Sequence, residues 1–248
     1  DSTTINSNFK INVDVESWKN EDDWHFYFDE MNENQVDINS TEIGSKIEIT
    51  QLHESVSKNF GLENFLSELK QELRTAHSVA IDKGLSITFN GVPVESKYIS
   101  LLDSDVIKPA NKKIIFDEQS KAPLNIRIFA GIAGQRSLEE GGWYVFCNGR
   151  MVLEADQTII TGWGETGGQS IPKYHADFAF FRGYIFFDCD DAEKLPWTTT
   201  KTGVDTDSVK YHAARLEMIN VMKPVLSFLR VLAREKSEAE TEGDDYLE

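Results

Sequence analysis

The stretch Leu195-Pro196-Trp197-Thr198-Thr199-Thr200-Lys201-Thr202-Gly203 decides how the second half of the chain is organised. It places one lysine in a hydroxyl-rich loop, after an apolar segment that predicts a strand at Gly183 to Phe187 and before a long amphipathic segment. A lysine on a loop held at both ends suits contact with a phosphate, because its ammonium acts as a compact point charge. The alternative is a polar loop that leads into a helix and carries a solvated lysine.

The segment after this loop predicts a helix from about Asp205 to Lys236. Its apolar side chains recur at helical spacing and form one stripe. Pro224 lies inside the helix and should kink it or split it in two, because proline has no N–H and its ring crowds the preceding turn. The residues beyond it, 237–248, are strongly acidic and predict a solvated, disordered tail.

Upstream of the loop, alternating apolar and polar residues predict three half-buried strands. They lie at Phe9 to Val15, Trp24 to Phe28 and Ile47 to Ile49, with polar turns at Asn20 to Asp23 and Asn32 to Ser40. This first part of the chain therefore predicts a β-rich segment, which we assign to residues 1–60.

The next part, residues 61–122, predicts a helix, a hairpin and a connecting region. Apolar residues repeat at three-to-four spacing from Leu62 to Ala80, and Gly84 should end the helix in a left-handed conformation. Asn90-Gly91 then predicts a hairpin turn, because both residues tolerate positive φ. A second Asn-Gly pair, Asn148-Gly149, predicts another hairpin inside the following domain, residues 123–236.

Strands and helices do not alternate one for one, so the pattern predicts an α+β fold rather than a doubly wound parallel sheet. No run of apolar residues is long enough for a transmembrane helix, and no signal peptide is visible at the first residues. The two cysteines, Cys147 and Cys189, lie in strand-like segments and indicate a reducing, cytoplasmic setting.

The net charge of −17 argues against nucleic-acid binding by this chain, since neutralising phosphates requires clustered Lys and Arg. The five histidines show no metal-ligand spacing, so we assign no metal site. One rival interpretation is a metal-dependent phosphoesterase that uses oxygen ligands. Its candidate ligands are His175, Asp177, Asp188, Asp190 and Asp191. A second rival is a free-standing protein-binding or scaffold module.

The order of three motifs resembles the GHKL ATPases, the superfamily of gyrase, the heat-shock chaperone, histidine kinases and MutL. Gly44-Ser45 before an apolar segment resembles the Gly-Thr pair that opens the last strand of the ATP-binding domain. Val145 to Val152, with Asn148-Gly149-Arg150, resembles the Asn-Gly-Arg hairpin of MutL and the matching segment of MORC ATPases. The loop from Pro196 to Lys201 resembles the loop that carries the switch lysine.

The resemblance implies the end of a GHKL ATPase sheet in residues 1–60, followed by a transducer domain (ribosomal protein S-five domain-2-like) with a long C-terminal helix. Lys201 would be the catalytic switch lysine, which reaches the γ-phosphate of ATP. Gly44, Ser45, Thr200 and Thr202 would help to bind the nucleotide. Arg150 would either pair with an acidic neighbour or contact a partner or a nucleic-acid phosphate.

The adenine-binding motif Asp-x-Gly-x-Gly is absent from this sequence, and Glu33-Asn34 and Glu63-Asn64 do not have the family's spacing. The resemblance therefore implies that the catalytic half lies upstream and supplies most contacts to ATP and Mg²⁺. We expect this chain alone to be inactive and to partner that missing half. The family also implies ATP-driven homodimers and a cytoplasmic protein, or a nuclear one if it is MORC-like.

Overall fold

A computed structural model describes residues 5–20, 25–26, 29–35, 44–97, 101–105, 107–167 and 170–244. The chain forms two compact units, Asp1–Ser57 and Lys58–Glu248. The finer division of the second unit, at residues 122 and 236, stays a prediction.

The first unit contains an antiparallel pair of strands, β1 (Ile5–Lys10) and β2 (Glu30–Gln35), in which Ile5 pairs with Gln35. A short helix, α1 (Val15–Trp18), follows β1, and the Asp14 carboxylate caps it by accepting from the Ser17 amide. The carboxylate's hydrogen bond from that amide lowers the pKa of Asp14. The chain leaves the unit through α2 (Glu54–Asn59).

Several predictions for the first unit are wrong. The first strand ends at Lys10 instead of Val15, and β2 occupies part of the predicted turn at Asn32 to Ser40. Residues 45–50 form no strand, and Ile47 and Ile49 are 86% and 74% exposed. Their alternation indicated burial on one face, but none of the described elements of this unit covers them. Of the strand predicted at Trp24 to Phe28, only His25 and Phe26 are among the described residues, and they are not in a strand.

The second unit begins with α3 (Glu63–Asp82) and a small hairpin of β3 (Thr88–Phe89) and β4 (Val92–Pro93). The predicted end of α3 is confirmed. Gly84 has φ +105°, its N–H donates to Ile81, and the Leu85 N–H donates to Ala80. This pair of bonds satisfies the last carbonyls of the helix and needs a left-handed residue at Gly84.

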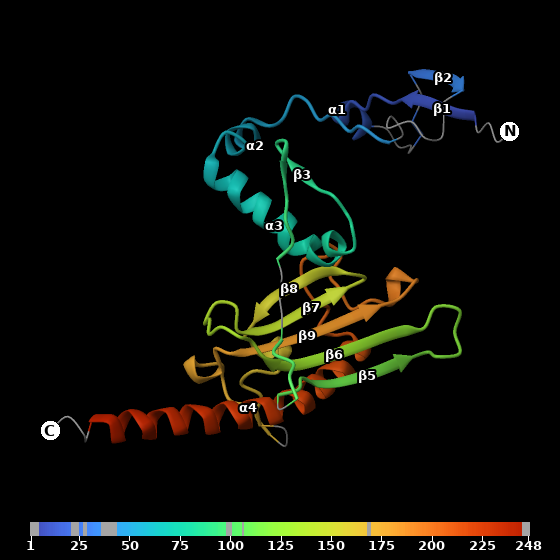
Figure 1. Ribbon diagram of the computed structural model, residues 1–248. Coiled ribbons are helices and arrows are strands. Elements are labelled where there is room, and N and C mark those ends of the chain that lie inside the picture. Colours follow the sequence, from blue (N-terminus) through green and yellow to red (C-terminus); the bar gives the residue numbers. More distant parts are fainter. Residues whose placement is uncertain are drawn as a thin grey trace. The chain divides into compact units, whose positions relative to one another are not determined.

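A five-stranded mixed sheet forms the centre of the second unit (Figure 1). Its order is β5-β6-β9-β7-β8, with β7 and β9 parallel and the other neighbours antiparallel. The strands are β5 (Ala110–Phe116), β6 (Leu124–Ile132), β7 (Gly142–Cys147), β8 (Arg150–Asp156) and β9 (Phe181–Asp188). The α+β class is thus confirmed. Three short 3₁₀ turns, η1 (Ile159–Thr161), η2 (Ala176–Phe178) and η3 (Ala192–Lys194), complete the connections.

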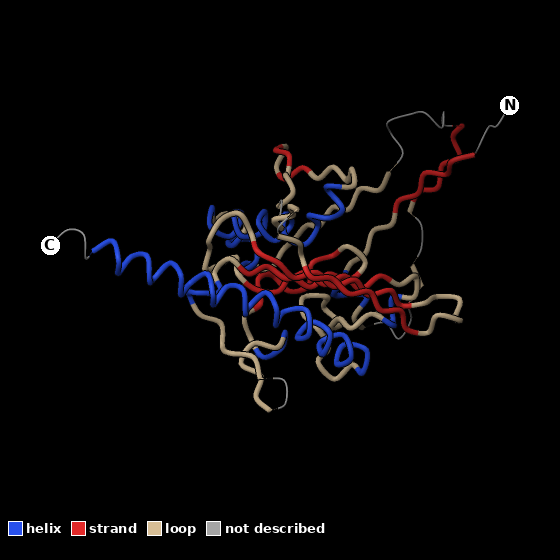
Figure 2. Tube along the Cα trace, turned by 60° about the horizontal axis from the view of Figure 1, so that its bottom comes forward, coloured by secondary structure: helices blue, strands red, loops and turns tan. Residues whose placement is uncertain are grey.

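The two faces of the sheet carry different helices (Figure 2). The long helix α4 (Val209–Asp244) packs against β5, β6 and β9, and α3 packs against β8. The main core lies under α4 and is built from aliphatic and aromatic side chains with almost no exposure. Gly183 is required here, because a Cβ at this position would lie 2.4 Å from the ring of Trp143 on the adjacent strand.

Helix α4 differs from its prediction in two respects. Pro224 lies inside it without dividing it, and the helix continues to Asp244. The acidic residues 237–244, predicted to be disordered, therefore belong to its last turns, and residues 245–248 lie outside the described residues. Within the described part of the chain, no helix combines the length and apolarity that crossing a membrane requires.

Candidate functional site

The lysine loop, defined here as residues 197–204, lies between η3 and α4 and is closed by a β-bridge from Trp197 to Val204. Inside it, the Thr198 N–H donates to the Gly203 carbonyl at 3.0 Å, and the Lys201 N–H donates to the Thr198 carbonyl at 2.8 Å. Lys201 is exposed and has φ +57°. A left-handed backbone costs a lysine roughly 1–2 kcal/mol, so these bonds hold the tip of the loop in an unfavourable conformation.

Three of the four threonines around the lysine form a chain of hydroxyl groups. Thr198 Oγ1 lies 3.2 Å from Thr200 Oγ1, which lies 2.8 Å from Thr202 Oγ1. The two bonds use two of the three hydroxyl protons, so one hydroxyl can still donate to an external acceptor while the chain is kept. The loop therefore presents a free hydroxyl donor beside one ammonium group.

The Lys201 ammonium lies against an aromatic ring of its own loop. Its Nζ is 4.5 Å from the centroid of Trp197, a cation–π distance. No role was predicted for Trp197 from the sequence, although the residue lies four positions before Lys201. An aromatic residue four positions before a lysine, with a tight turn between them, is the signal that could have suggested this contact.

The Asn-Gly-Arg hairpin touches the lysine loop directly. Asn148 and Gly149 have φ of +47° and +78° and connect β7 to β8, which confirms the predicted turn. Arg150 then donates from Nε to the Lys201 carbonyl at 3.2 Å. Arg150 thus makes a structural contact with a backbone carbonyl, and its contact with a partner stays a prediction.

The side chain of Asn148 extends the parallel pairing of β7 and β9. Its Nδ2 donates to the Cys189 carbonyl at 2.8 Å, and its Oδ1 accepts from the Cys189 N–H at 2.9 Å. The Asn148 N–H also donates to the Phe187 carbonyl. The asparagine thus fixes the hairpin to the end of β9, from which the chain proceeds to the lysine loop.

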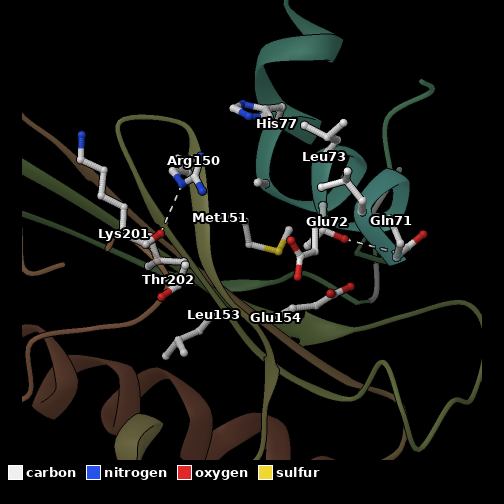
Figure 3. Close-up of a pocket in the computed structure, with 14 residues that line it drawn as sticks. Gln71, Glu72, Leu73, His77, Arg150, Met151, Leu153, Glu154, Lys201 and Thr202 are labelled. Carbon is white, nitrogen blue, oxygen red and sulfur yellow. Dashed lines mark hydrogen bonds between the residues drawn. The ribbon is translucent and has the colours of Figure 1, made fainter. Parts of the chain in front are cut away.

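A groove of about 360 Å³ lies between α3, β8 and the lysine loop (Figure 3). Figure 3 shows the Lys201 side chain extending away from the acidic side chains of the groove, Glu72 and Glu154. The groove also contains the apolar side chains Leu73 and Met151. The groove could not be predicted from the sequence, because it depends on the packing of α3 against β8.

The remaining predicted nucleotide contacts, Gly44 and Ser45, belong to the first unit, and both are exposed in an irregular segment. A Cβ added at Gly44 would meet no atom within 4 Å. Within the second unit, the structure brings together Arg150, Lys201 and the neighbouring threonines.

Three carboxylates of the rival metal site, those of Asp177, Asp188 and Asp191, have partners within the protein. Asp188 accepts from Arg127 at 2.9 Å, and Asp191 accepts from the Glu193 N–H at 3.2 Å as the cap of η3. The Nδ1 atom of His175 lies 3.6 Å from the Oδ2 atom of Asp177. Among the described residues, no three His, Cys, Asp or Glu side chains cluster as metal ligands would.

The two cysteines are free and buried. Burial raises the pKa of the Cys147 thiol to about 12, and the nearby Asp188 charge adds to the effect. Because the thiolate is the nucleophilic form, Cys147 is an inert core residue at neutral pH.

No family model and no curated protein matches this chain. The geometry of the lysine loop and its neighbours is therefore the basis of the proposals that follow.

Proposed function

We propose that this chain is the transducer portion of a GHKL-type ATPase, of the kind found in MutL-like and MORC-like proteins, and that Lys201 senses the γ-phosphate of ATP. The observation that carries the proposal is the position of Lys201, exposed at the tip of a closed loop between β9 and α4. A nucleotide bound by another part of the protein would contact this loop. The resulting displacement of the loop would be transmitted to β9 and α4.

The residues of the loop fit a phosphate and not a metal ion. Lys201 supplies a positive charge, and Thr200 and Thr202 supply hydroxyl donors, but the loop has no carboxylate. Lys201 would hold the phosphate, while Mg²⁺ and the adenine would be bound by the ATP-binding half. ATP supplies the phosphoanhydride bond whose hydrolysis removes the group that Lys201 contacts.

The energies favour a switch between two positions of the ammonium. Its contact with Trp197 is worth about 0.5–1 kcal/mol at an exposed site. A hydrogen bond to a charged group is worth about 1.5–3 kcal/mol. Lys201 should therefore leave the ring when a triphosphate is presented and return after hydrolysis, which gives the differential contact that a nucleotide switch requires.

Two features connect the loop to the rest of the unit. Arg150, at the start of β8, donates to the Lys201 carbonyl. A movement of the loop tip would therefore displace β8 and change the shape of the groove beside α3. On the other side, the chain enters α4 directly after the bridge at Val204. Such a unit would transmit nucleotide state to a partner, including a second copy in an ATP-driven homodimer.

The first test is the coding sequence upstream of Asp1. The proposal requires a helix with a Glu base and a metal-binding Asn, followed by Asp-x-Gly-x-Gly. An upstream sequence without these motifs, in a protein that hydrolyses no ATP, would rule the proposal out.

The second test is Lys201→Ala in the protein that includes the ATP-binding half. Loss of the phosphate contact, about 1.4–2.8 kcal/mol, should lower the ATPase rate about tenfold to a hundredfold at about 1.4 kcal/mol per decade. Stability should fall by no more than about 0.5–1 kcal/mol, the value of the exposed contact with Trp197, since alanine keeps the same backbone preference. Thr198→Ala is the matched control, because it alters the hydroxyl chain and keeps the ammonium. Wild-type turnover in Lys201→Ala would refute the switch assignment.

The second candidate function is a protein-binding module, favoured by the groove between α3 and β8, which mixes apolar and acidic side chains. It predicts partner binding by this chain that is independent of ATP and unaffected by Lys201→Ala. A pull-down with and without nucleotide separates it from the first proposal.

A further inference from the structure

The mixed sheet has two edge strands, β8 beside the lysine loop and β5 at the opposite side (Figure 1). β5 pairs with β6 along its whole length, beginning with Ala110 opposite Ala130. Its other side, which we call the β5 edge, shares no residue with the proposed nucleotide switch.

The β5 edge has unused hydrogen-bonding groups. In an antiparallel pair, every second residue of a strand directs its N–H and C=O away from its neighbour. Among the described residues, β6 is the only strand that pairs with β5, and no backbone hydrogen bond from another segment reaches residues 110–116. Such a row of alternating donors and acceptors matches the backbone of an extended peptide, whereas phosphate oxygens only accept.

The side chains in the middle of the β5 edge are basic, although the chain has a net charge of −17. Lys112 and Lys113 are exposed and lie on opposite faces of the sheet, because successive strand residues alternate. The nearest acidic residue in sequence, Asp117, pairs with Lys210 at 3.2 Å. Neither lysine of the edge forms an ion pair within the described part of the chain. Two adjacent unpaired lysines favour acidic side chains on an added strand.

A second copy of β5 does not fit this edge. Antiparallel pairing of two β5 strands about their central residue would place Lys113 directly opposite its own copy, and like charges in that position are destabilising. Lysines on an edge strand protect a sheet against such self-pairing. The same lysines attract a strand that carries carboxylates in register with them, so the edge selects a different polypeptide.

An apolar groove of about 220 Å³ lies at the beginning of β5, between the sheet and α4. Ala110 lines it from β5, and Pro224, Val225 and Phe228 line it from α4. The Phe228 side chain is 45% exposed there. On an added strand, the residue opposite Ala110 lies on the same face as the residue opposite Lys112. An apolar side chain at that position would cover the groove.

We propose that the β5 edge binds an extended acidic segment of a partner protein by strand addition. The segment runs antiparallel to β5, with two consecutive acidic residues opposite Lys113 and Lys112. An apolar residue follows two positions after the second acidic residue and lies at the groove beside Phe228. In this mode of recognition, main-chain hydrogen bonds supply affinity and alternate side chains supply specificity. The inference is independent of the proposed ATPase function.

The first experiment is a fluorescence-anisotropy titration of the complete chain against the fluorescein-labelled peptide Thr-Val-Val-Glu-Glu-Thr-Leu. Its residues match the register from Phe116 back to Ala110. The Kd should be on the order of 10–100 μM, because the interface is small. A peptide with Lys-Lys in place of Glu-Glu should bind at least about tenfold more weakly, since it places like charges opposite each other.

Two N-methylated forms of the acidic peptide test the pairing of the backbones. One form is methylated at the second, fourth and sixth residues, and the other at the third, fifth and seventh. Only one of these sets directs its N–H groups toward β5. Methylation of that set should weaken binding at least about tenfold, whereas methylation of the other should leave the Kd within about threefold.

Charge reversal tests the register of the side chains. The variant Lys112→Glu/Lys113→Glu should bind the acidic peptide at least about tenfold more weakly than the wild type, and it should bind the Lys-Lys peptide more tightly. A lysine pair with a merely structural role would not exchange the preference. Lys121→Glu, in the turn that connects β5 to β6, is the matched control and should change either Kd by at most about threefold.

The proposal is overturned if the acidic peptide shows no saturable binding, if both N-methylated forms bind alike, or if charge reversal leaves the preference unchanged. A further contrary result is self-association of Lys112→Gln/Lys113→Gln in sedimentation velocity together with no binding of the peptide by the wild type. The lysines would then only protect the edge. None of these outcomes alters the interpretation of Lys201→Ala, because the lysine loop lies beside the opposite edge strand.

Discussion

The two faces of β9 are built from alternate residues of one strand, yet they differ in chemistry and in cover. Ile185 and Phe187 point to the α4 face and are fully buried. Tyr184 and Phe186 point to the α3 face, where Phe186 keeps part of its surface exposed and the Tyr184 hydroxyl has no hydrogen bond within the described residues. The α4 face of the sheet therefore mainly stabilises the fold, whereas the α3 face retains surface that can take part in recognition.

The cause lies in the two helices. Helix α4 packs across β5, β6 and β9, whereas α3 packs mainly against β8, at the edge of the sheet. The buried surface under α4 can be aliphatic, because closely packed branched side chains need no polar partner. The α3 face is covered less completely. It keeps the groove beside the lysine loop and a cavity of about 470 Å³ over β6 and β9.

The largest expected effect tests this comparison with two adjacent residues of the same type. Phe187→Ala should lower the free energy of unfolding by about 3–5 kcal/mol, the usual cost of removing a fully buried phenylalanine. Phe186→Ala should cost roughly 1–2 kcal/mol, because its ring is partly exposed and loses mainly the stacking with Phe146. Urea unfolding of both variants gives the two values.

Equal losses in the two variants would show that α3 covers its face as completely as α4 does. A larger loss for Phe186→Ala would reverse the assignment of the stabilising face.

The sequence predicted those parts of the fold that depend on local chemistry. Asn90-Gly91 and Asn148-Gly149 form their turns as expected, and Gly84 ends α3, because positive φ is a property of the residues themselves. The long helix was also predictable from its apolar stripe. The exposure of Ile47 and Ile49 was not predictable, because alternation indicates a strand only where another element covers one face.

The candidate site was predicted in part for the same reason. The exposed position of Lys201 between a strand and the last helix follows from sequence order. The contacts of Lys201 with Trp197 and Arg150 depend on loop closure and on the neighbouring hairpin. The bonds of Asn148 to Cys189 join residues 41 positions apart, and neither the turn motif nor the strand pattern contains that information.

A smaller effect compares the two Asn-Gly hairpins. Asn148→Ala loses two hydrogen bonds to the Cys189 backbone, whereas the exposed side chain of Asn90 makes none within the described residues. Both variants lose the tolerance of asparagine for positive φ. The difference in the free energy of unfolding should therefore be about 1–3 kcal/mol, the net value of two hydrogen bonds, and parallel denaturant titrations measure it.

If Asn148→Ala and Asn90→Ala destabilise equally, the asparagine does not hold β7 to the end of β9. The contact from Arg150 to Lys201 would then lack its structural support.

The smallest expected effect is the loss of stability at high pH, and it tests which face of the sheet causes that loss. Burial raises the pKa of Cys147, on the α4 face, from about 9 to about 12, and it raises the pKa values of Tyr144 and Tyr184 on the α3 face from about 10. Between pH 9 and pH 10 the unfolded chain releases the Cys147 proton while the folded chain retains it. Stability should therefore be complete below pH 9 and fall as pH rises, by at most about 1.4 kcal/mol per pH unit for one proton. Cys147→Ala should be less stable at neutral pH, because it leaves a small cavity, but its stability should decline less than that of the wild type between pH 9 and pH 10, since only the buried tyrosines then contribute. Urea unfolding at pH 8, 9 and 10 measures both curves. A decline of equal slope in wild type and variant would place the alkaline sensitivity outside Cys147.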